Sequence, residues 1–223
     1  MTAAQRRPAP HDASAERWTA LHHGIDPARV PLLLPWLRLL WRLARPLRAV
    51  PPTVITVLGV LLALDAVLLA GSLPGAAAGA VVLAAVCDGL DGAVAVVADR
   101  ATSGGAVADA VADRISDVAF AAVLWRCGAP WALAVACGVL AVGVDVLRRV
   151  RRVPAVITVG ERATWTVCAV LAAGCAAITD AEWPATVCGA VWAAAGVVAL
   201  GQIGRPFHAS RPARRSRHDA AVR

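Results

Sequence analysis

The segment "CDGLDGAVAVVADRATSGGAVADAVADR", residues 87–114, lies between runs of Ala, Val and Leu that are long enough to cross a bilayer. An aspartate at the centre of a bilayer costs about 2.5–3.5 kcal/mol on insertion scales, unless it faces water or a cation. Asp88 and Asp91 are three residues apart, and Asp109 and Asp113 are four apart. Each pair therefore shares one face of a helix, which indicates a site rather than scattered acidic residues.

The short polar stretch 99–103 separates the two aspartate pairs and predicts a turn between two helices. Helices joined by so short a turn should be antiparallel neighbours, with both acidic faces converging on the same side. Four convergent carboxylates repel one another unless divalent cations neutralise them. Oxygen ligands of this kind suit Mg²⁺, Mn²⁺ or Ca²⁺ better than zinc or copper.

Outside this segment the chain is apolar throughout its middle. Hydrophobic residues make up 59% of it, against about 45–50% in an ordinary soluble domain. Six apolar segments each approach the roughly 20 residues that a membrane-spanning helix needs; they cover residues 53–71, 75–98, 104–125, 130–148, 162–179 and 184–203. The sequence therefore predicts an all-α integral membrane protein with six transmembrane helices.

The basic residues, all 22 of them arginine, are distributed unevenly over the predicted loops. Twenty fall on one side when both termini are placed on that side. Since positively charged loops face the cytoplasm, we expect both termini to be cytoplasmic and the protein to be a multi-pass protein of the cell (inner) membrane. We expect the arginines behind the net charge of +7 to interact with anionic lipid head groups. Nucleic acid is therefore not an expected partner.

A basic, amphipathic stretch precedes the first span. Arg38, Arg42, Arg45 and Arg48 follow one another at helical spacing, among leucines and tryptophans. We interpret residues 27–50 as an interfacial amphipathic helix. An ordinary basic linker is the alternative, because Pro46 interrupts a long helix.

The domain organisation follows from these segments. Residues 1–26 and 206–223 are expected to be disordered tails, the second of them basic, and residues 51–205 form the six-helix domain. The six cysteines lie within or at the ends of apolar segments and form no Cys-x-x-Cys pair, so we interpret them as small buried residues.

The aspartates and glycines form a pattern over residues 88–113. Asp88-x-x-Asp91-Gly92-x-x-Ala95 is followed, after nine residues, by Gly105-x-x-x-Asp109-x-x-x-Asp113. This resembles the signature D-x-x-D-G-x-x-A-R-x8-G-x-x-x-D-x-x-x-D of the CDP-alcohol phosphatidyltransferase family. The likeness covers roughly residues 34–203. In a second motif, Thr53 replaces the family's Asn ahead of Thr56, and in the first motif Val96 replaces its Arg.

The resemblance implies roles for the matching positions. Asp88, Asp91 and Asp109 would hold a two-metal centre of Mg²⁺ or Mn²⁺, with Asp113 also near it and acting as the base. The nucleotide would lie against Gly92, Ala95, Gly105 and Thr56. The implied donor is a CDP-linked lipid such as CDP-diacylglycerol, the acceptor an alcohol or phosphorylated alcohol, and the leaving group CMP. A homodimer is implied as well.

Two arginines are candidates for binding a phosphorylated acceptor. Arg148 and Arg152 lie four residues apart on the predicted inner side, so they share a helical face. Arginines in such loops also set membrane topology, which is the competing explanation. Asp117 continues the series of Asp109 and Asp113, and we expect it to contact Arg114 or a polar group between helices rather than a metal.

Two other functions are compatible with the sequence. An Asp-lined path would suit a cation or solute transporter, although no repeated halves or broken helices are evident. Because Val96 stands where the family has Arg, the protein is alternatively a non-catalytic member that binds nucleotide or lipid.

Overall fold

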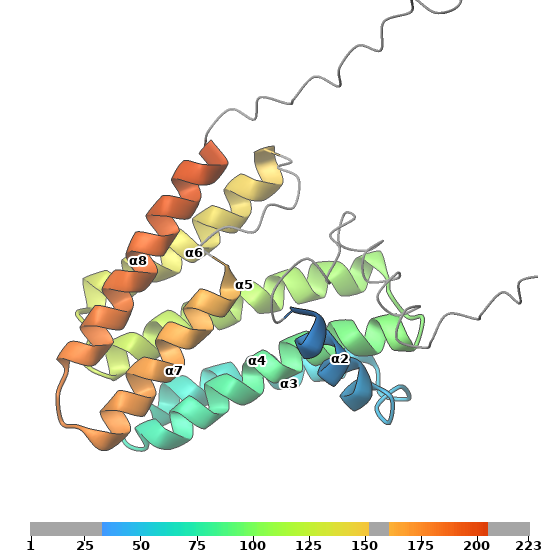
Figure 1. Cartoon of the computed structure of the whole chain (residues 1–223), viewed down its shortest axis with the longest axis horizontal. Coiled ribbons are helices and arrows are strands. Elements are labelled where there is room, and N and C mark those ends of the chain that lie inside the picture. The colour runs from blue at the N-terminus through green and yellow to red at the C-terminus, as the bar shows by residue number, and fades with distance from the viewer. Residues whose placement is uncertain (1–32, 152–160, 205–223) are drawn as a thin grey trace, which may run out of the picture.

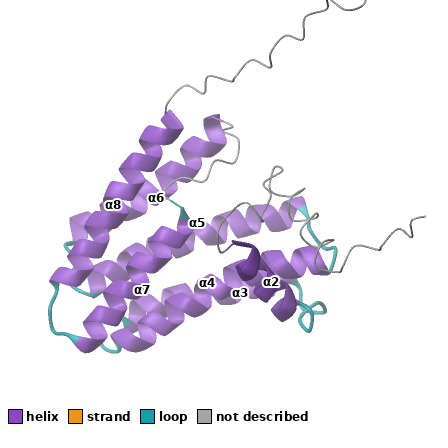
Figure 2. Cartoon of the chain, viewed as in Figure 1, coloured by secondary structure: helices purple, strands orange, loops and turns teal. Residues whose placement is uncertain are grey.

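The computed structural model describes residues 33–151 and 161–204, and in these ranges all regular secondary structure is α-helical (Figures 1 and 2). The helices are α2 (Leu33–Ala44), α3 (Pro52–Leu69), α4 (Pro74–Val97), α5 (Ser103–Arg126), α6 (Trp131–Arg151), α7 (Arg162–Ile178) and α8 (Trp183–Gly204). The predicted all-α class is confirmed for this part of the chain. Each of the six apolar segments coincides with one helix, with ends that agree within three residues. The two predicted tails and residues 27–32 lie outside the described residues.

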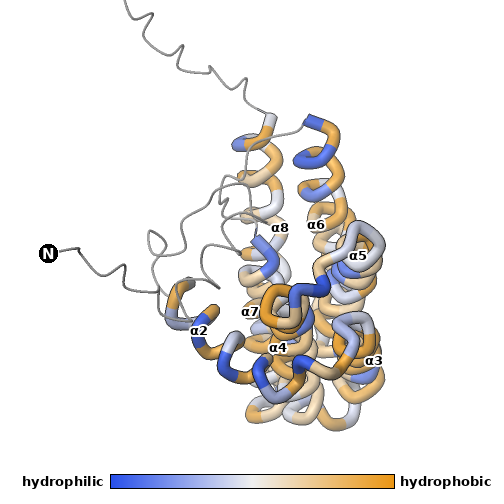
Figure 3. Tube along the Cα trace, turned by 90° about the vertical axis from the view of Figure 1, so that its right-hand side faces the viewer, coloured by the Kyte–Doolittle hydropathy of each residue, from blue (hydrophilic) through white to orange (hydrophobic). Residues whose placement is uncertain are grey.

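The helices differ in how well they suit a membrane. Four are long and apolar enough to cross one, namely α3, α4, α6 and α8. Helix α7 is apolar but has 17 residues, and α5 carries charged residues along its first half. Figure 3 shows apolar residues along most of the bundle and hydrophilic residues where α6 ends. The chain is thus a multi-pass membrane protein, and among the described helices four meet the length and composition of a span.

The turn between α4 and α5 is encoded locally. Asp99 has a left-handed backbone, with φ of 55°, which aspartate tolerates better than most residues. The amide of Arg100 donates to the carbonyl of Ala95 over 2.9 Å, and this bond closes the end of α4. Thr102 then starts α5, because its Oγ1 accepts a 3.0 Å hydrogen bond from the amide of Gly105.

Small residues form most of the bundle core. The buried alanines lie along the helix contacts and allow the backbones to approach closely; they include Ala63, Ala66, Ala77, Ala84, Ala121, Ala141, Ala169 and Ala173. One aromatic contact stands out among them: Trp165 of α7 stacks on Trp192 of α8, with ring centroids 5.1 Å apart and planes inclined by 14°. Helices α6 and α8 also lie side by side, at one edge of the bundle (Figure 1).

Helix α5 packs mainly against α3, α6 and α7, and only sparsely against α4. The sequence predicted that the two motif helices, α4 and α5, would be neighbours, and this is correct only near their joining turn and at the acidic side chains. The reason is that α7 packs against both helices, and its first residue, Arg162, reaches acidic side chains of both. The aspartates of α4 and α5 are therefore brought together by the Arg162 side chain and not by a continuous contact between the two helices.

Helix α2 packs against α4 through Leu37, Leu40 and Trp41, all buried. Gly89 of α4 makes room for it, because a Cβ at that position would lie only 2.8 Å from Leu40 Cδ1. The apolar face of the predicted interfacial helix is thus partly covered by protein.

The far side of α2 is exposed and mixed in character. It presents Trp36, Leu39 and Leu43 next to Arg38 and Arg42. The helix ends at Ala44, six residues before the predicted end, and turns follow. Pro46 accounts for the difference, since proline lacks an amide donor and disfavours helix in the residue before it.

Candidate metal and nucleotide site

Three carboxylates form a compact group in the bundle, here called the carboxylate cluster: Asp88 of α4 with Asp109 and Asp113 of α5. Each offers an oxygen atom, and these three atoms lie within 4.8 Å of one another. All three side chains are partly buried. Negative charges at this separation require a neutralising cation, and a group of carboxylate oxygens could hold a divalent metal ion. The predicted convergence of the two motif helices is confirmed for these three residues.

Asp91, the fourth motif aspartate, is outside this group of three and has hydrogen-bond partners of its own. Its Oδ2 accepts a 2.5 Å hydrogen bond from Thr56 Oγ1 of α3, and its Oδ1 accepts one of 2.6 Å from the amide of Gly92. The side chain is buried, with 4% exposed. Thr56 therefore holds Asp91 in place, a contact that the sequence pattern predicted for neither residue.

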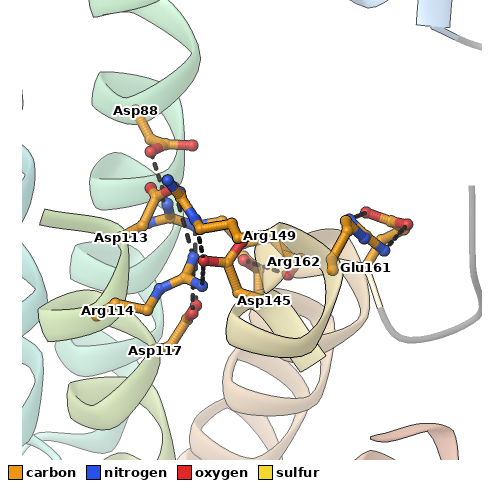
Figure 4. A network of polar contacts seen from close by, with 10 residues as sticks. Asp88, Asp113, Arg114, Asp117, Asp145, Arg149, Glu161 and Arg162 are labelled. Atoms are coloured by element: carbon orange, nitrogen blue, oxygen red, sulfur yellow. Dashed lines mark hydrogen bonds and ion pairs between the residues drawn. The ribbon is translucent and has the colours of Figure 1, made fainter. Parts of the chain in front are cut away.

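A guanidinium lies where the cluster most needs positive charge. Arg162 Nη1 lies 2.8 Å from Asp88 Oδ1 and also contacts Asp113 Oδ1 (Figure 4). Arg162 is the first residue of α7, so the packing of α7 against α4 and α5 brings it there. Arg162 was not among the site residues predicted from the sequence. The sequence did contain one indication of this role: Arg162 is the first residue of an apolar helix. A charged side chain in that position has few polar groups nearby with which it can pair.

A second arginine links the cluster to α6. Arg114 contacts Asp113 at 3.5 Å, Asp117 at 3.4 Å and Asp145 at 2.9 Å. Asp145 in turn pairs with Arg149 at 2.7 Å (Figure 4). The expectation that Asp117 contacts Arg114 is confirmed. Alternating charges thus run from the carboxylate cluster to the C-terminal end of α6.

A small pocket, open on one side, adjoins the carboxylate cluster. Residues of α3, α4, α5 and α7 line it, and the lining combines acidic, basic, hydroxyl and small apolar side chains: Thr56, Gly59, Val60, Ala84, Asp88, Asp91, Ala112, Ser116 and Arg162. The structure therefore brings Thr56, Asp88 and Asp91 to one cavity. Ser116, which is buried, was not predicted.

The other predicted nucleotide residues lie nearer the α4–α5 turn. A Cβ at Gly92 would meet nothing within 4 Å, so the space beside it is open. Ala95 and Gly105 are partly exposed, and Gly105 is engaged with Thr102. These three residues are outside the lining of the pocket that contains Thr56.

The structure describes only one of the two residues that were predicted to bind the acceptor, Arg148. Arg148 pairs with Glu161, 2.9 Å from Nη2 to Oε1, and Glu161 directly precedes α7. Arg152 lies outside the described residues. At the position of the motif arginine, Val96 is buried with 6% exposed, and Arg100 extends instead towards the carbonyl of Ala49 at 3.5 Å.

Comparison with known proteins agrees with this arrangement. No curated protein matches the chain closely enough to be counted as a relative. The sequence profile of one family, described as CDP-alcohol phosphatidyltransferase, matches residues 49–201, which include α3 to α7 and most of α8. The match contains all three members of the carboxylate cluster and Asp91 with its partner Thr56. The chain therefore belongs to the CDP-alcohol phosphatidyltransferase family, whose members use divalent metal ions for phosphatidyl transfer in phospholipid synthesis.

Proposed function

We propose that this protein transfers a phosphatidyl or similar phospho-alcohol group from a CDP-linked lipid, such as CDP-diacylglycerol, to an alcohol acceptor, with release of CMP. The observation that carries the proposal is the carboxylate cluster, in which oxygens of Asp88, Asp109 and Asp113 approach within 4.8 Å at the family's motif positions. A membrane-embedded site of this kind suits a donor and a product that both dissolve in the bilayer.

In this proposal Asp88, Asp109 and Asp113 hold Mg²⁺ or Mn²⁺, and Asp91, fixed by Thr56, completes a two-metal centre. Paired divalent ions offset the charge of a diphosphate and stabilise the attacking and leaving oxygens in phosphoryl transfer. Arg114 contributes further positive charge beside Asp113, at 3.5 Å. The residues therefore fit the metal that the family uses.

The proposed reaction is a single displacement at phosphorus. The acceptor hydroxyl oxygen bonds to the phosphorus that carries the lipid, the bond from that phosphorus to the CMP oxygen breaks, and the hydroxyl proton passes to Asp113. Asp113 suits this role because it belongs to the cluster and remains partly exposed, with 20% of its side chain accessible.

The remaining assignments follow the same proposal. Thr56 and the small residues Gly92, Ala95 and Gly105 accommodate the cytidine nucleotide, with Thr56 on the pocket wall and Gly92 beside open space. Arg148, beside the start of α7, and Arg152 bind the phosphate of a phosphorylated acceptor. The pairing of Arg148 with Glu161 would have to open for this to happen.

The membrane arrangement is also a proposal. All six helices from α3 to α8 cross the membrane, within a domain of residues 51–205, and α2 lies in the cytoplasmic interface with its exposed tryptophan and leucines towards lipid. Both tails, residues 1–26 and 206–223, are cytoplasmic in the cell (inner) membrane. The protein works as a homodimer.

The test is release of CMP by the purified protein in detergent or nanodiscs. CDP-diacylglycerol is offered with glycerol 3-phosphate, inositol phosphate, inositol or serine. CMP should form with one acceptor, only when Mg²⁺ or Mn²⁺ is present. Asp113→Asn should lower the rate by about 10²-fold or more, the scale of a lost general base. Full activity of Asp113→Asn would refute the role of that residue, and metal-dependent ion flux without CMP release would favour a transporter.

A non-catalytic role has one observation in its favour, the buried Val96 where the family has arginine. A protein of that kind would bind CDP-diacylglycerol or CMP in the presence of Mn²⁺, and would release no CMP with any acceptor. Isothermal titration with CMP, performed on the same preparation as the activity assay, separates the two functions.

A further inference from the structure

Arg162 binds the oxygen atoms that a metal ion would need. Its Nη1 lies 2.8 Å from Asp88 Oδ1 and contacts Asp113 Oδ1, and both residues belong to the carboxylate cluster. The side chain is 23% exposed, so water screens these contacts only in part. A divalent cation and the guanidinium cannot both occupy the space between Asp88 and Asp113. The two cations must therefore compete for it.

A second acceptor for the guanidinium lies on its other edge. Asp117 Oδ1 is 4.0 Å from Arg162 Nε, and Asp117 is buried with 2% exposed. This oxygen accepts no hydrogen bond from any residue that the structure describes, whereas Oδ2 of the same carboxylate contacts Arg114 at 3.4 Å. An unsatisfied buried carboxylate oxygen is costly, and a small rotation of Arg162 would satisfy it.

We propose that Arg162 is a tethered counter-cation with two positions: between Asp88 and Asp113 when the metal is absent, and on Asp117 Oδ1 when the metal is bound. The inference rests on the metal centre of the proposed function and assigns Arg162 and Asp117 as its positioning residues. In the first position the guanidinium offsets the repulsion within the carboxylate cluster. In the second it leaves the oxygens free and keeps one positive charge nearby.

Metal affinity tests the competition directly. Mn²⁺ binding to the full-length protein in detergent is measured by electron paramagnetic resonance of free Mn²⁺, with wild type, Arg162→Gln and Arg162→Lys. Arg162→Gln should bind Mn²⁺ more tightly, with a Kd lower by on the order of tenfold. The ion pairs of Arg162 are partly buried, so their strength lies between that of exposed and that of fully buried ion pairs. Arg162→Lys keeps the positive charge but lacks the bidentate guanidinium, so its Kd for Mn²⁺ should lie between those of wild type and Arg162→Gln.

A matched control removes one arginine charge elsewhere on the same side. Arg151 is exposed and donates to the carbonyl of Gly204 over 2.9 Å, away from the carboxylate cluster. Arg151→Gln should leave the Kd for Mn²⁺ unchanged. An unchanged or weaker affinity in Arg162→Gln would overturn the proposal and leave Arg162 as a structural tie. If Arg162→Gln does not fold, the comparison of Arg162→Lys with wild type decides, and equal affinities there overturn the proposal.

The second position is tested by a double-mutant cycle with Asp117→Asn. In the wild-type background this change should weaken Mn²⁺ binding severalfold, because the displaced guanidinium loses its acceptor. In the Arg162→Gln background that part of the loss should vanish. Equal losses in both backgrounds would mean that Asp117 acts through its charge alone, and would overturn the two-position arrangement.

The proposed function and this inference fail in distinguishable ways. Absence of Mn²⁺ binding to the wild type removes the metal centre and both proposals with it. Metal-dependent CMP release by a wild type whose Mn²⁺ affinity is indifferent to Arg162 leaves the proposed function intact and removes only the inference.

Discussion

At the scale of the residue, the hydroxyl group of Thr56 helps to orient the motif aspartate Asp91. Thr56 donates to Asp91 across the contact between α3 and α4, and the Gly92 amide binds the other oxygen. We expect Thr56→Val, which is close in shape, to lower stability by about 1 kcal/mol through the lost hydrogen bond. It should also weaken Mn²⁺ binding severalfold, because Asp91 is then free to rotate. Thermal unfolding and Mn²⁺ titration measure the two effects.

Thr179→Val is the matched control for that substitution. The Thr179 hydroxyl donates to the backbone carbonyl of Cys175, at the end of α7 opposite to Arg162. The control should leave Mn²⁺ affinity unaltered. Similar affinities for Thr56→Val and wild type would show that Asp91 is oriented by its backbone partner alone.

The motif aspartates also show how much the spacing of single residues can predict. Helical spacing, together with the short turn at 99–103, was enough to predict that Asp88 meets Asp109 and Asp113, because residues three or four apart share a face and the turn brings the two faces to the same side. It was not enough for Asp91, whose orientation depends on a hydroxyl in another helix, nor for Arg162, which reaches the cluster only through the packing of α7. Contacts set by local periodicity are predictable from sequence, and contacts set by tertiary packing are not.

At the scale of the element, the contact between α3 and α4 depends on Gly59. A Cβ at this position would lie 3.2 Å from the Cβ of Cys87 and 3.5 Å from the carbonyl of Ala84. Gly59→Val should therefore push the helices apart and destabilise the protein by about 1–3 kcal/mol, the usual range for overpacking. The change also distorts the pocket that Gly59 lines, so activity should fall with stability.

Gly79 of α4 provides the comparison, because a Cβ there meets nothing within 4 Å. Gly79→Val should be neutral or slightly stabilising, since most residues favour a helix over glycine. Thermal unfolding of both variants in the same detergent gives the contrast. Equal melting temperatures for the two would show that α3 and α4 can separate at little cost.

Element boundaries and element contacts differed in how far they could be predicted. The ends of α3 to α8 follow from apolar runs and from prolines such as Pro52 and Pro74 at first helical positions, and the structure agrees with them. The end of α2 was predicted too late, although Pro46 explains it. The sparse contact of α4 with α5 could not be predicted from chain order, because both helices pack more closely against α3 and α7 than against each other.

At the scale of the whole molecule, metal binding should stabilise the bundle, because the carboxylate cluster joins two helices through groups that repel one another. Mn²⁺ at a hundred times its Kd should stabilise the native state by about 2.7 kcal/mol. Asp109→Asn should remove most of that gain and raise the metal-free stability slightly. Melting temperatures with Mn²⁺ and with EDTA measure it; no shift in the wild type would contradict a metal centre.

The distribution of arginines over the two ends of the helices predicts orientation. A C-terminal fusion to a fluorescent protein should be bright, and one to alkaline phosphatase inactive, if the end of α8 faces the cytoplasm. A fusion placed in the turn between α7 and α8, near Asp180, should behave in the opposite way. Active phosphatase at the C-terminus would reverse the proposed topology.

Trp165, which stacks on Trp192, lies about one helical turn after Arg162. Because both rings are buried, they anchor the first turn of α7 to α8 and oppose any sliding of that helix. The proposed movement of Arg162 between its two positions would then be a rotamer change about its own side-chain bonds, a faster class of motion than a helix shift. The backbone of α7 would then stay in place while the Arg162 side chain moves. The rate of metal binding would accordingly be limited by how quickly an ion reaches the site.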